Sequence, residues 1–362
     1  MNTKPKRKNN EFVDTACQNL DWHLSRKKFF EKFICALIKV QTVCFSRLSE
    51  GFESEAKVES RLRRIQRFFE GFDVCQDLIA RLIYCLLPCD APYRLCIDRT
   101  NWKFGKANIN ILMLSVVYDG IGIPLLWTML PKRGNSNEAE RRRLLKRYLD
   151  LFGVDSIDCI IGDREFIGKK WFRYLTNKGI RFYMRVKENM WVTLQPGIEM
   201  KAYQLFRHNK FNRAKSFGPQ VSIDGNKVYL QGLKILNKEG QCEYVIVASL
   251  KPDPDALVRY KDRWQIETMF KGLKSSGFNL EDTHLTDLSR LSKMLAMLSV
   301  AYVWAYRVGI YRNKHIKPIQ IKKHGRRAYS VFKYGLIFIA QALLNPTGIK
   351  DYEICTKVLS CT

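Results

Sequence analysis

The chain has 362 residues, enough for two or three domains, and its 62 lysines and arginines outnumber 35 aspartates and glutamates to give a net charge of +27. This charge excludes an ordinary neutral metabolic enzyme as the first expectation and favours a polyanionic partner, nucleic acid before an anionic membrane. A hydrophobic content of 46% excludes a disordered chain. Because residues 1–90 carry +4 and residues 313–362 carry +7, a single basic tail on a neutral enzyme is also excluded.

Residues 12–87 show helical periodicity and predict an α-helical N-terminal domain over residues 1–90. An apolar stripe at helical spacing includes Phe30, Phe33 and Leu37. A second helix, expected over 57–69, carries arginines along one edge, among them Arg61 and Arg64. A run of charge is most often a solvated helix face. The alternative, in so basic a chain, is a helix that lies on DNA with these two arginines as contacts.

Strands replace helices from residue 93. We expect strands over 93–98, 110–118 and 121–130, with Asp119-Gly120 as a hairpin turn, and Pro124 predicts an edge strand or a bulge. Asn137 then caps a helix over 138–152, and a strand over 157–161, a helix over 168–178 and a strand over 180–186 follow. This order predicts an α/β fold, a mixed sheet with flanking helices, as the first part of a core over 91–189.

Short strands and turns over 190–250 predict a β-rich insertion, followed by a helical second part of the core over 251–312. A basic helical C-terminal segment covers residues 313–362. The longest apolar run, 294–306, is shorter than the ~20 residues of a membrane span. Lys4 to Lys8 are followed by polar residues rather than an apolar core. We therefore expect a buried helix at 294–306 and a cytoplasmic protein with no signal peptide and no membrane partner.

The eleven cysteines include no Cys-x-x-Cys pair, and several lie inside apolar runs, namely Cys35, Cys85 and Cys159. Their number is odd, which disfavours a disulfide framework. We interpret them as buried thiols in a reducing compartment. With five scattered histidines, a zinc site is not expected.

One helix, expected over 257–274, carries a tight group of polar residues. At 100° per residue, Tyr260, Arg263, Glu267 and Lys274 fall within a sector of about 60°. A salt-bridged surface face would explain the charges but not the narrow sector.

Two aspartates each follow a buried strand, Asp98 after Leu95-Cys96-Ile97 and Asp163 after Ile160-Ile161-Gly162. A single aspartate in such a place is more often a cap or turn residue. Two of them, together with the helix carboxylate of Glu267, would repel one another unless cations neutralise them. Hard oxygen ligands suit Mg²⁺ or Mn²⁺, and two such ions can serve phosphodiester displacement.

These residues carry a resemblance to a known family. The spacing Tyr260-x2-Arg263-x3-Glu267-x6-Lys274, with Asp98-Arg-Thr-Asn-Trp and Gly162-Asp-Arg-Glu-Phe, resembles the DDE transposases of bacterial insertion sequences. More narrowly, it resembles their insertion-sequence-four branch, and the resemblance covers roughly residues 90–310. It implies an RNase-H-like (retroviral-integrase-like) core with a β-rich insertion before the glutamate. Asp98, Asp163 and Glu267 would be the catalytic and metal-binding residues for two Mg²⁺ ions, with Mn²⁺ as a substitute.

The resemblance also implies cut-and-paste transposition through a DNA hairpin, on double-stranded DNA that carries terminal inverted repeats and on target DNA. A homodimer would hold two ends in a synaptic complex, associated with the bacterial nucleoid. Tyr260, Arg263 and Lys274 are expected to contact phosphates near the scissile bond. Arg164 either reaches a phosphate or pairs with a carboxylate. Trp191 is the candidate to stack an extruded base, against the simpler alternative of a core residue.

Two other functions remain open from the sequence. A metal-dependent nuclease or resolvase would share the site without joining strands. A non-catalytic DNA-binding regulator derived from a transposase would need none of the carboxylates, and the presence of all three in the sequence disfavours it.

Overall fold

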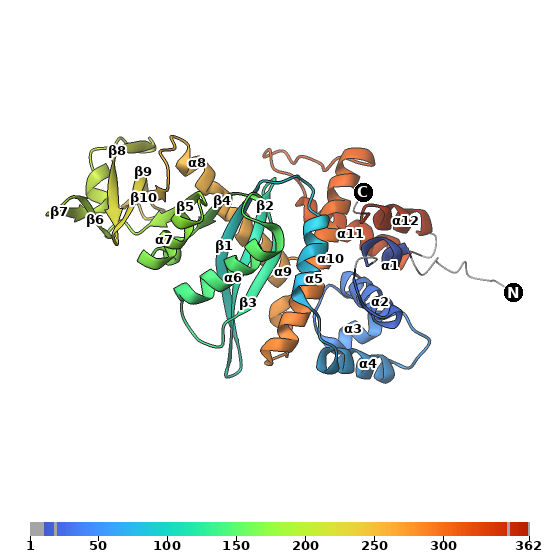
Figure 1. The fold of residues 1–362 in the computed structure, drawn as a ribbon. Helices are drawn as coiled ribbons and strands as arrows, with labels where there is room; N and C mark the ends of the chain where they lie inside the picture. The colour runs from blue at the N-terminus through green and yellow to red at the C-terminus, as the bar shows by residue number, and fades with distance from the viewer. Residues whose placement is uncertain (1–10, 18–19, 346–347, 361–362) are drawn as a thin grey trace. The chain divides into compact units, whose positions relative to one another are not determined.

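The structure is a computed structural model that describes residues 11–17, 20–345 and 348–360, which form two compact units (Figure 1). The first unit comprises Met1–Cys89, Trp102–Ile109 and Met269–Thr362, and the second comprises Asp90–Asn101 and Asn110–Thr268. The basic segment at residues 4–8 lies outside the described residues.

A ten-stranded mixed sheet is the framework of the second unit, with strand order β3-β2-β1-β4-β5-β10-β9-β8-β6-β7. Its first strands follow one another as neighbours: β1 (Tyr93–Phe104), β2 (Ala107–Tyr118) and β3 (Ile121–Met129). β4 (Ile157–Gly162) runs parallel to β1, and β5 (Phe182–Val186) runs parallel to β4. The predicted RNase-H-like mixed sheet with flanking helices is therefore confirmed.

Pro124 lies on the outermost strand of this arrangement. β3 ends the strand order, and its ladder with β2 shifts register between Leu114 and Ser115, where Ser115 faces Pro124. A proline has no backbone N–H to donate, so an edge strand with an irregular ladder accommodates it. Both features predicted from the proline are present.

Two helices follow the meander, α6 (Glu138–Phe152) and α7 (Lys169–Asn177), with the short 3₁₀ turn η1 (Arg164–Phe166) between β4 and α7. α6 begins as predicted at Asn137, whose side chain accepts a hydrogen bond from the Glu140 amide at 2.9 Å. The Glu140 carboxylate accepts in return from the Asn137 amide at 2.7 Å. This capping box satisfies two amides that would otherwise lack partners.

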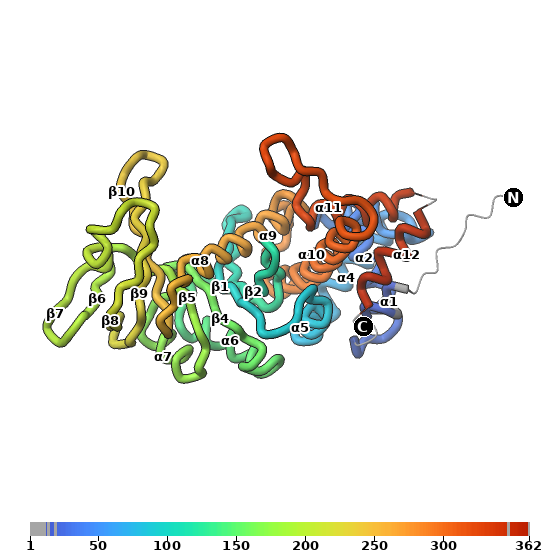
Figure 2. The backbone as a smooth tube through the Cα atoms, turned by 90° about the horizontal axis from the view of Figure 1, so that it is seen from above, coloured from blue at the N-terminus to red at the C-terminus, as the bar shows by residue number. Residues whose placement is uncertain are grey.

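The β-rich insertion continues the sheet of the core (Figure 2). Ile246 to Ser249 of its last strand pair antiparallel with Val186 to Tyr183 of β5. The sequence predicts strands here but not their partners, since register with a distant strand leaves no local pattern. The elements are β6 (Trp191–Gln195), β7 (Ile198–Lys201), η2 (Ala202–Phe206), β8 (Lys215–Ile223), β9 (Asn226–Leu236) and β10 (Cys242–Ser249).

The single helix expected over 257–274 is wrong in one respect. The segment is α8 (Ala256–Tyr260), a 3₁₀ turn η3 (Lys261–Arg263) and α9 (Trp264–Lys274). Because a 3₁₀ turn has three residues per turn, angles at 100° per residue do not hold across it. α9 approaches β3 closely at Gly122, where an added Cβ would lie 3.0 Å from the Gln265 carbonyl oxygen.

The first unit contains the helices of both ends of the chain. The stripe on α2 is buried as predicted, with Phe30, Phe33 and Leu37 fully inaccessible to solvent. Its helices are α1 (Glu11–Ala16), α2 (Leu24–Val40), α3 (Phe45–Gly51), α4 (Val58–Gly71), α5 (Gln76–Cys85), α10 (Leu288–His315), α11 (Val331–Leu344) and α12 (Ile349–Lys357), with the 3₁₀ turn η4 (Leu280–Asp282).

α10 is the central helix of this unit, and residues 294–306 are buried along their whole length, as predicted. Among the described residues, it is the helix long and apolar enough to cross a membrane by length and composition, and 83% of its most apolar window is buried inside the protein. None of the ten described cysteines forms a disulfide. Cys85 is exposed, contrary to its expected burial, because it lies on the side of α5 away from buried Ile79 and Ile83.

Candidate active site

Asp98 and Asp163 lie at neighbouring positions of two parallel strands. The pairing of β1 with β4 runs up to Ile97 opposite Gly162. Asp163 directly follows the end of β4, whereas Asp98 lies inside β1, which continues to Phe104 rather than ending at residue 98 as predicted. Neighbouring strands lie about 4.8 Å apart. The sheet therefore brings these two carboxylates side by side.

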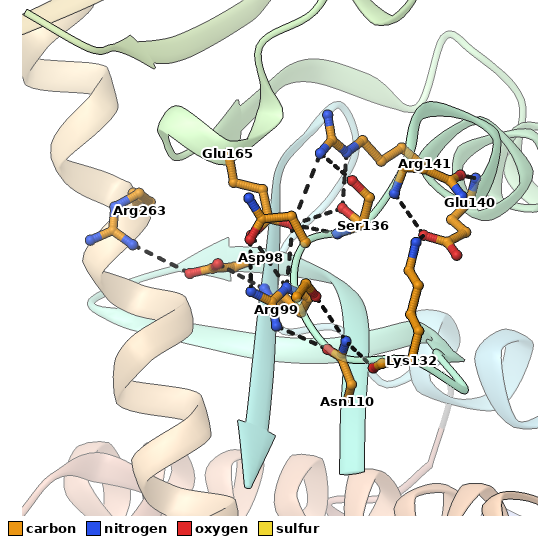
Figure 3. A network of polar contacts seen from close by, with 12 residues as sticks. Asp98, Arg99, Asn110, Lys132, Ser136, Glu140, Arg141, Glu165 and Arg263 are labelled. Carbon is orange, nitrogen blue, oxygen red and sulfur yellow. Dashed lines mark hydrogen bonds and ion pairs between the residues drawn. The ribbon is translucent and has the colours of Figure 1, made fainter. Parts of the chain in front are cut away.

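Arg263 joins the helix carboxylate to this pair. Its Nη1 donates to Asp98 Oδ2 at 3.3 Å and its Nη2 donates to Glu267 Oε1 at 2.7 Å. Figure 3 shows Arg263 directed from its helical segment toward Asp98. Only 6% of Arg263 is exposed, and its buried Nε has no hydrogen-bond partner in the described structure. One guanidinium thus holds carboxylates from a strand and a helix that are 169 residues apart in sequence (267 minus 98).

Tyr260 approaches the other aspartate. Its hydroxyl donates to Asp163 Oδ1 at 3.3 Å, and the ring is buried. Burial and the Asp163 carboxylate raise the pKa of the Tyr260 phenol, so the hydroxyl stays protonated and remains a donor. In this arrangement Tyr260 orients a carboxylate.

Burial dominates the electrostatics of Asp98. It raises the pKa of this carboxyl from 3.8 to about 6, and the charges of Asp163 and Glu165 add to the effect. The Arg99 amide, which donates to Asp98 Oδ1 at 2.7 Å, and the charge of Arg263 act in the opposite direction. The site therefore holds a carboxylate whose ionised form is costly unless a cation approaches.

Ionisation of the Asp98 carboxyl should lower the free energy of unfolding of the protein as pH rises. Its pKa is higher in the folded state than in the unfolded state, so the folded state binds the proton more tightly between about pH 4 and about pH 6. Asp98→Asn removes this titration. In the absence of divalent ions, we expect the free energy of unfolding of the variant, relative to that of the wild type, to increase by up to about 3 kcal/mol between about pH 4 and neutral pH. Urea unfolding of both proteins at both pH values measures this increase. A difference in free energy of unfolding that does not change with pH would contradict the prediction.

Arg99 and Glu165 form a second ion pair behind the aspartates. Arg99 Nε lies 3.3 Å from both Glu165 carboxylate oxygens, and its guanidinium also donates to the side chains of Asn110 and Asn135, each at 3.1 Å. Both partners of the pair are largely buried, with side chains 14% and 15% exposed. Because the Arg99 amide donates to Asp98, this ion pair fixes the backbone next to the Asp98 carboxylate.

Further polar groups complete this network (Figure 3). Glu165 accepts from the amide of Ser136 at 3.0 Å and from its hydroxyl at 2.8 Å, and Arg141 donates to the same hydroxyl at 2.9 Å. The sequence analysis does not single out Arg99 or Glu165, although each stands in a motif with Asp98 or Asp163. Their position directly after, or two residues after, an aspartate is the signal that could have found them.

Lys274, Arg164 and Trp191 lie in different surroundings. Lys274, at the end of α9 in the first unit, pairs with Glu281 at 2.6 Å and lies 5.2 Å from the Trp102 ring centroid. Arg164 is exposed at the start of η1, directly after Asp163. Trp191 is 57% exposed, which excludes the core alternative, and the Lys201 ammonium lies 3.8 Å from its ring centroid.

The two arginines of α4 differ in their surroundings. Arg61 donates to the carbonyl oxygens of Ala56 at 2.7 Å and Phe52 at 3.1 Å, so it fastens the loop before α4. Arg64 is exposed and lies over the rings of Phe29 and Phe52 at 5.7 and 5.8 Å. Of the two, Arg64 has the geometry of a surface contact.

The donor chemistry of Asp98, Asp163 and Glu267 suits a divalent cation, because carboxylates are hard oxygen ligands and the pKa of the buried Asp98 is raised. As the described side chains stand, no group of three or more His, Cys, Asp or Glu residues is arranged to hold an ion. Arg263 occupies the oxygens of Asp98 and Glu267 instead. A bound cation and the guanidinium would therefore compete for the same atoms.

Comparison with known proteins agrees with this geometry. Residues 91–304 match a family described as the transposase DDE domain, which is more than half of the chain and includes all three carboxylates. No curated protein matches the chain.

Proposed function

Because the chain belongs to the DDE transposase family, whose members are enzymes that act on DNA, we propose that it moves an insertion sequence by cut-and-paste transposition. The observation that carries the proposal is the alignment of Asp98 and Asp163 on adjacent parallel strands, with Glu267 tied to Asp98 through Arg263. The insertion-sequence-four branch, proposed from the Tyr260-to-Lys274 spacing, supplies the hairpin route.

Asp98, Asp163 and Glu267 would hold two Mg²⁺ ions, replaceable by Mn²⁺, which when bound supply Lewis-acid activation and neutralise developing charge. In the proposed sequence, water attacks the phosphodiester at the element end and frees a 3′-OH. That 3′-OH attacks the opposite strand, which forms a hairpin and releases the flanking DNA. Water reopens the hairpin, and the 3′-OH then attacks a phosphodiester of the target and displaces the target's own 3′-oxygen.

The chain's own residues have distinct proposed tasks. Arg263 neutralises Asp98 and Glu267 before ions bind, and it is proposed to contact a DNA phosphate once bound ions release its guanidinium from these carboxylates. Tyr260 holds Asp163 in place. Arg164 and Lys274 are proposed to contact phosphates near the scissile bond.

Trp191 is proposed to stack a base extruded when the hairpin forms, since its ring is exposed beside a lysine. Trp191→Ala should slow hairpin formation by about tenfold or more while the first nick keeps its rate, because stacking contributes only after the strand bends. Denaturing gels of a labelled end fragment separate the two products. Equal slowing of both steps would argue for a general binding role, and Tyr229→Ala on β9 serves as a control on another strand of the insertion.

Two regions outside the carboxylate cluster are proposed to bind DNA. The N-terminal helical domain, residues 1–90, would bind the element ends, with Arg64 as the clearest contact and Arg61 supporting the loop beside it. Residues 313–362, with a net charge of +7, would contact DNA or the second copy in a dimeric synaptic complex, within the bacterial cytoplasm.

Binding to DNA should be strongly salt-dependent. Each phosphate contact releases condensed counterions, so the association constant falls steeply with salt for a protein of net charge +27. We expect a loss of about a thousandfold between about 50 and about 200 mM salt, measured by fluorescence anisotropy with a labelled duplex. A change of less than about tenfold would contradict extensive phosphate contacts.

A joining assay tests the proposed reaction. The protein, Mg²⁺, a labelled duplex carrying the inverted repeat that flanks the gene, and a target plasmid should yield cleaved, hairpin and joined products. Cleavage without joining would favour the nuclease or resolvase, and binding without cleavage the regulator. Inverted repeats on both sides of the coding region, bordered by short direct duplications, would support the transposase independently.

A further inference from the structure

The first unit contains a cavity of about 430 Å³ that the proposed chemistry does not use. It lies between the last turns of α10, the C-terminal half of α12 and Pro88. Its volume falls within the range of small-molecule sites. All of its lining residues lie outside the stretch 91–304 that matches the DDE domain.

Positive charge surrounds the cavity. Arg307 and Lys314 come from α10, seven residues apart and so on one face of the helix, and Lys357 faces them from α12. His315 is the fourth nitrogen-bearing side chain, and no carboxylate is among the lining residues. Such a set of donors is suited to a compact group with more than one negative charge, as a terminal phosphate is.

The other lining residues are apolar or aromatic. Ile310, Ile354, Val358 and Pro88 form the apolar wall, and the Tyr311 ring is 36% exposed beside them. A bare inorganic ion would leave this wall without a partner. A planar ring system joined to a phosphate would cover the apolar wall and could stack on the Tyr311 ring.

The walls of the cavity are fixed to one another. The Trp304 indole, fully buried on α10, donates to the Cys355 carbonyl of α12 at 2.8 Å. The same indole meets the Tyr352 ring edge-on at 6.4 Å. Trp304 lies one turn before Arg307, and Cys355 lies between two lining residues of α12, so the cavity exists before a ligand arrives.

We propose that this cavity binds a nucleoside 5′-monophosphate, either free or as the phosphorylated end of a DNA strand. The phosphate would lie among Arg307, Lys314 and Lys357, and the base would lie against Tyr311 and the apolar wall. The proposal is independent of the catalytic carboxylates, so failure of DNA cleavage does not affect it.

Equilibrium dialysis of the full-length protein with dAMP tests the site, and inorganic phosphate and deoxyadenosine serve as competitors. Lys314→Gln/Lys357→Gln should weaken dAMP binding by about tenfold or more, because it removes two charged donors. Tyr311→Ala should weaken dAMP binding but leave the competition by inorganic phosphate unchanged. The control Lys317→Gln/Lys350→Gln removes the same charge from exposed lysines of the same unit that do not line the cavity, and it should bind dAMP as the wild type does.

Three results would overturn the proposal: equal loss in the control and in Lys314→Gln/Lys357→Gln, inorganic phosphate as strong a competitor as dAMP, or no dAMP binding by the wild type. Thermal unfolding shows whether each variant is folded. At a given concentration, dAMP should raise the unfolding midpoint of the wild type but not those of Lys314→Gln/Lys357→Gln and Tyr311→Ala. A single-stranded oligonucleotide with and without a 5′-phosphate separates the two sources. Preference for the phosphorylated strand assigns a strand end, and equal binding assigns the free nucleotide.

Discussion

Glu267→Gln should reduce DNA cleavage by about a thousandfold or more while binding to element ends persists. Glutamine keeps an oxygen that can accept from Arg263 Nη2, so the local hydrogen bond at 2.7 Å survives. The negative charge needed to attract a divalent ion is lost. Cleavage of a labelled end fragment measures the first effect, and anisotropy with the same fragment measures the second.

A matched control exists in the same unit. Glu243 on β10 forms an ion pair with Arg185 at 2.6 Å and is partly exposed, as Glu267 is. Glu243→Gln removes the same charge without touching the carboxylate cluster, so cleavage should remain within about twofold. Full cleavage by Glu267→Gln would refute the assignment of this residue, and loss of end binding would place it in the DNA-binding surface.

Glu165→Ala should cost about 3 kcal/mol of stability and about a hundredfold in cleavage, because it leaves the largely buried Arg99 without its carboxylate partner. Arg99 carries the amide that donates to Asp98, so a shift of the Arg99 backbone also moves the Asp98 carboxylate. Glu165→Gln keeps acceptors for the amide and hydroxyl of Ser136 and should lie between the wild type and the alanine variant. Urea unfolding and single-turnover cleavage measure the two effects.

A positioning role can be separated from a purely structural one. The Mg²⁺ concentration for half-maximal cleavage should rise in Glu165→Ala at a temperature where the variant is fully folded. If cleavage per folded molecule and its Mg²⁺ dependence match the wild type, Glu165 serves stability alone.

Much of the fold follows from local patterns in the sequence. The capping residue Asn137, the Asp119-Gly120 turn before β3 and the irregular edge strand at Pro124 are each set by neighbours along the chain. The pairing of β10 with β5 depends on residues about 60 positions apart, so no local signal predicts it. The 3₁₀ turn that ends at Arg263 was missed because its residues also fit an unbroken α-helix.

The carboxylates could be selected from the sequence because chemistry restricts which residues follow a buried strand. Which side chains form hydrogen bonds or ion pairs with these carboxylates depends on three-dimensional packing. No local pattern indicates the hydrogen bond from Tyr260 to Asp163 or the one from the Arg99 amide to Asp98. The exposure of Trp191 could not be predicted from the sequence either, because a tryptophan at the start of a strand can face either side of the sheet.

The continuous sheet has a consequence for how such enzymes diversify. β10 is hydrogen-bonded to β5 and a short loop connects it to α8, so a length change there would shift Glu267. The hairpin of β6 and β7, at the far margin of the strand order, has no such constraint. Apart from Trp191 and Lys201, evolution can therefore change the length or the charge of that outer hairpin to suit new DNA ends without moving the three carboxylates.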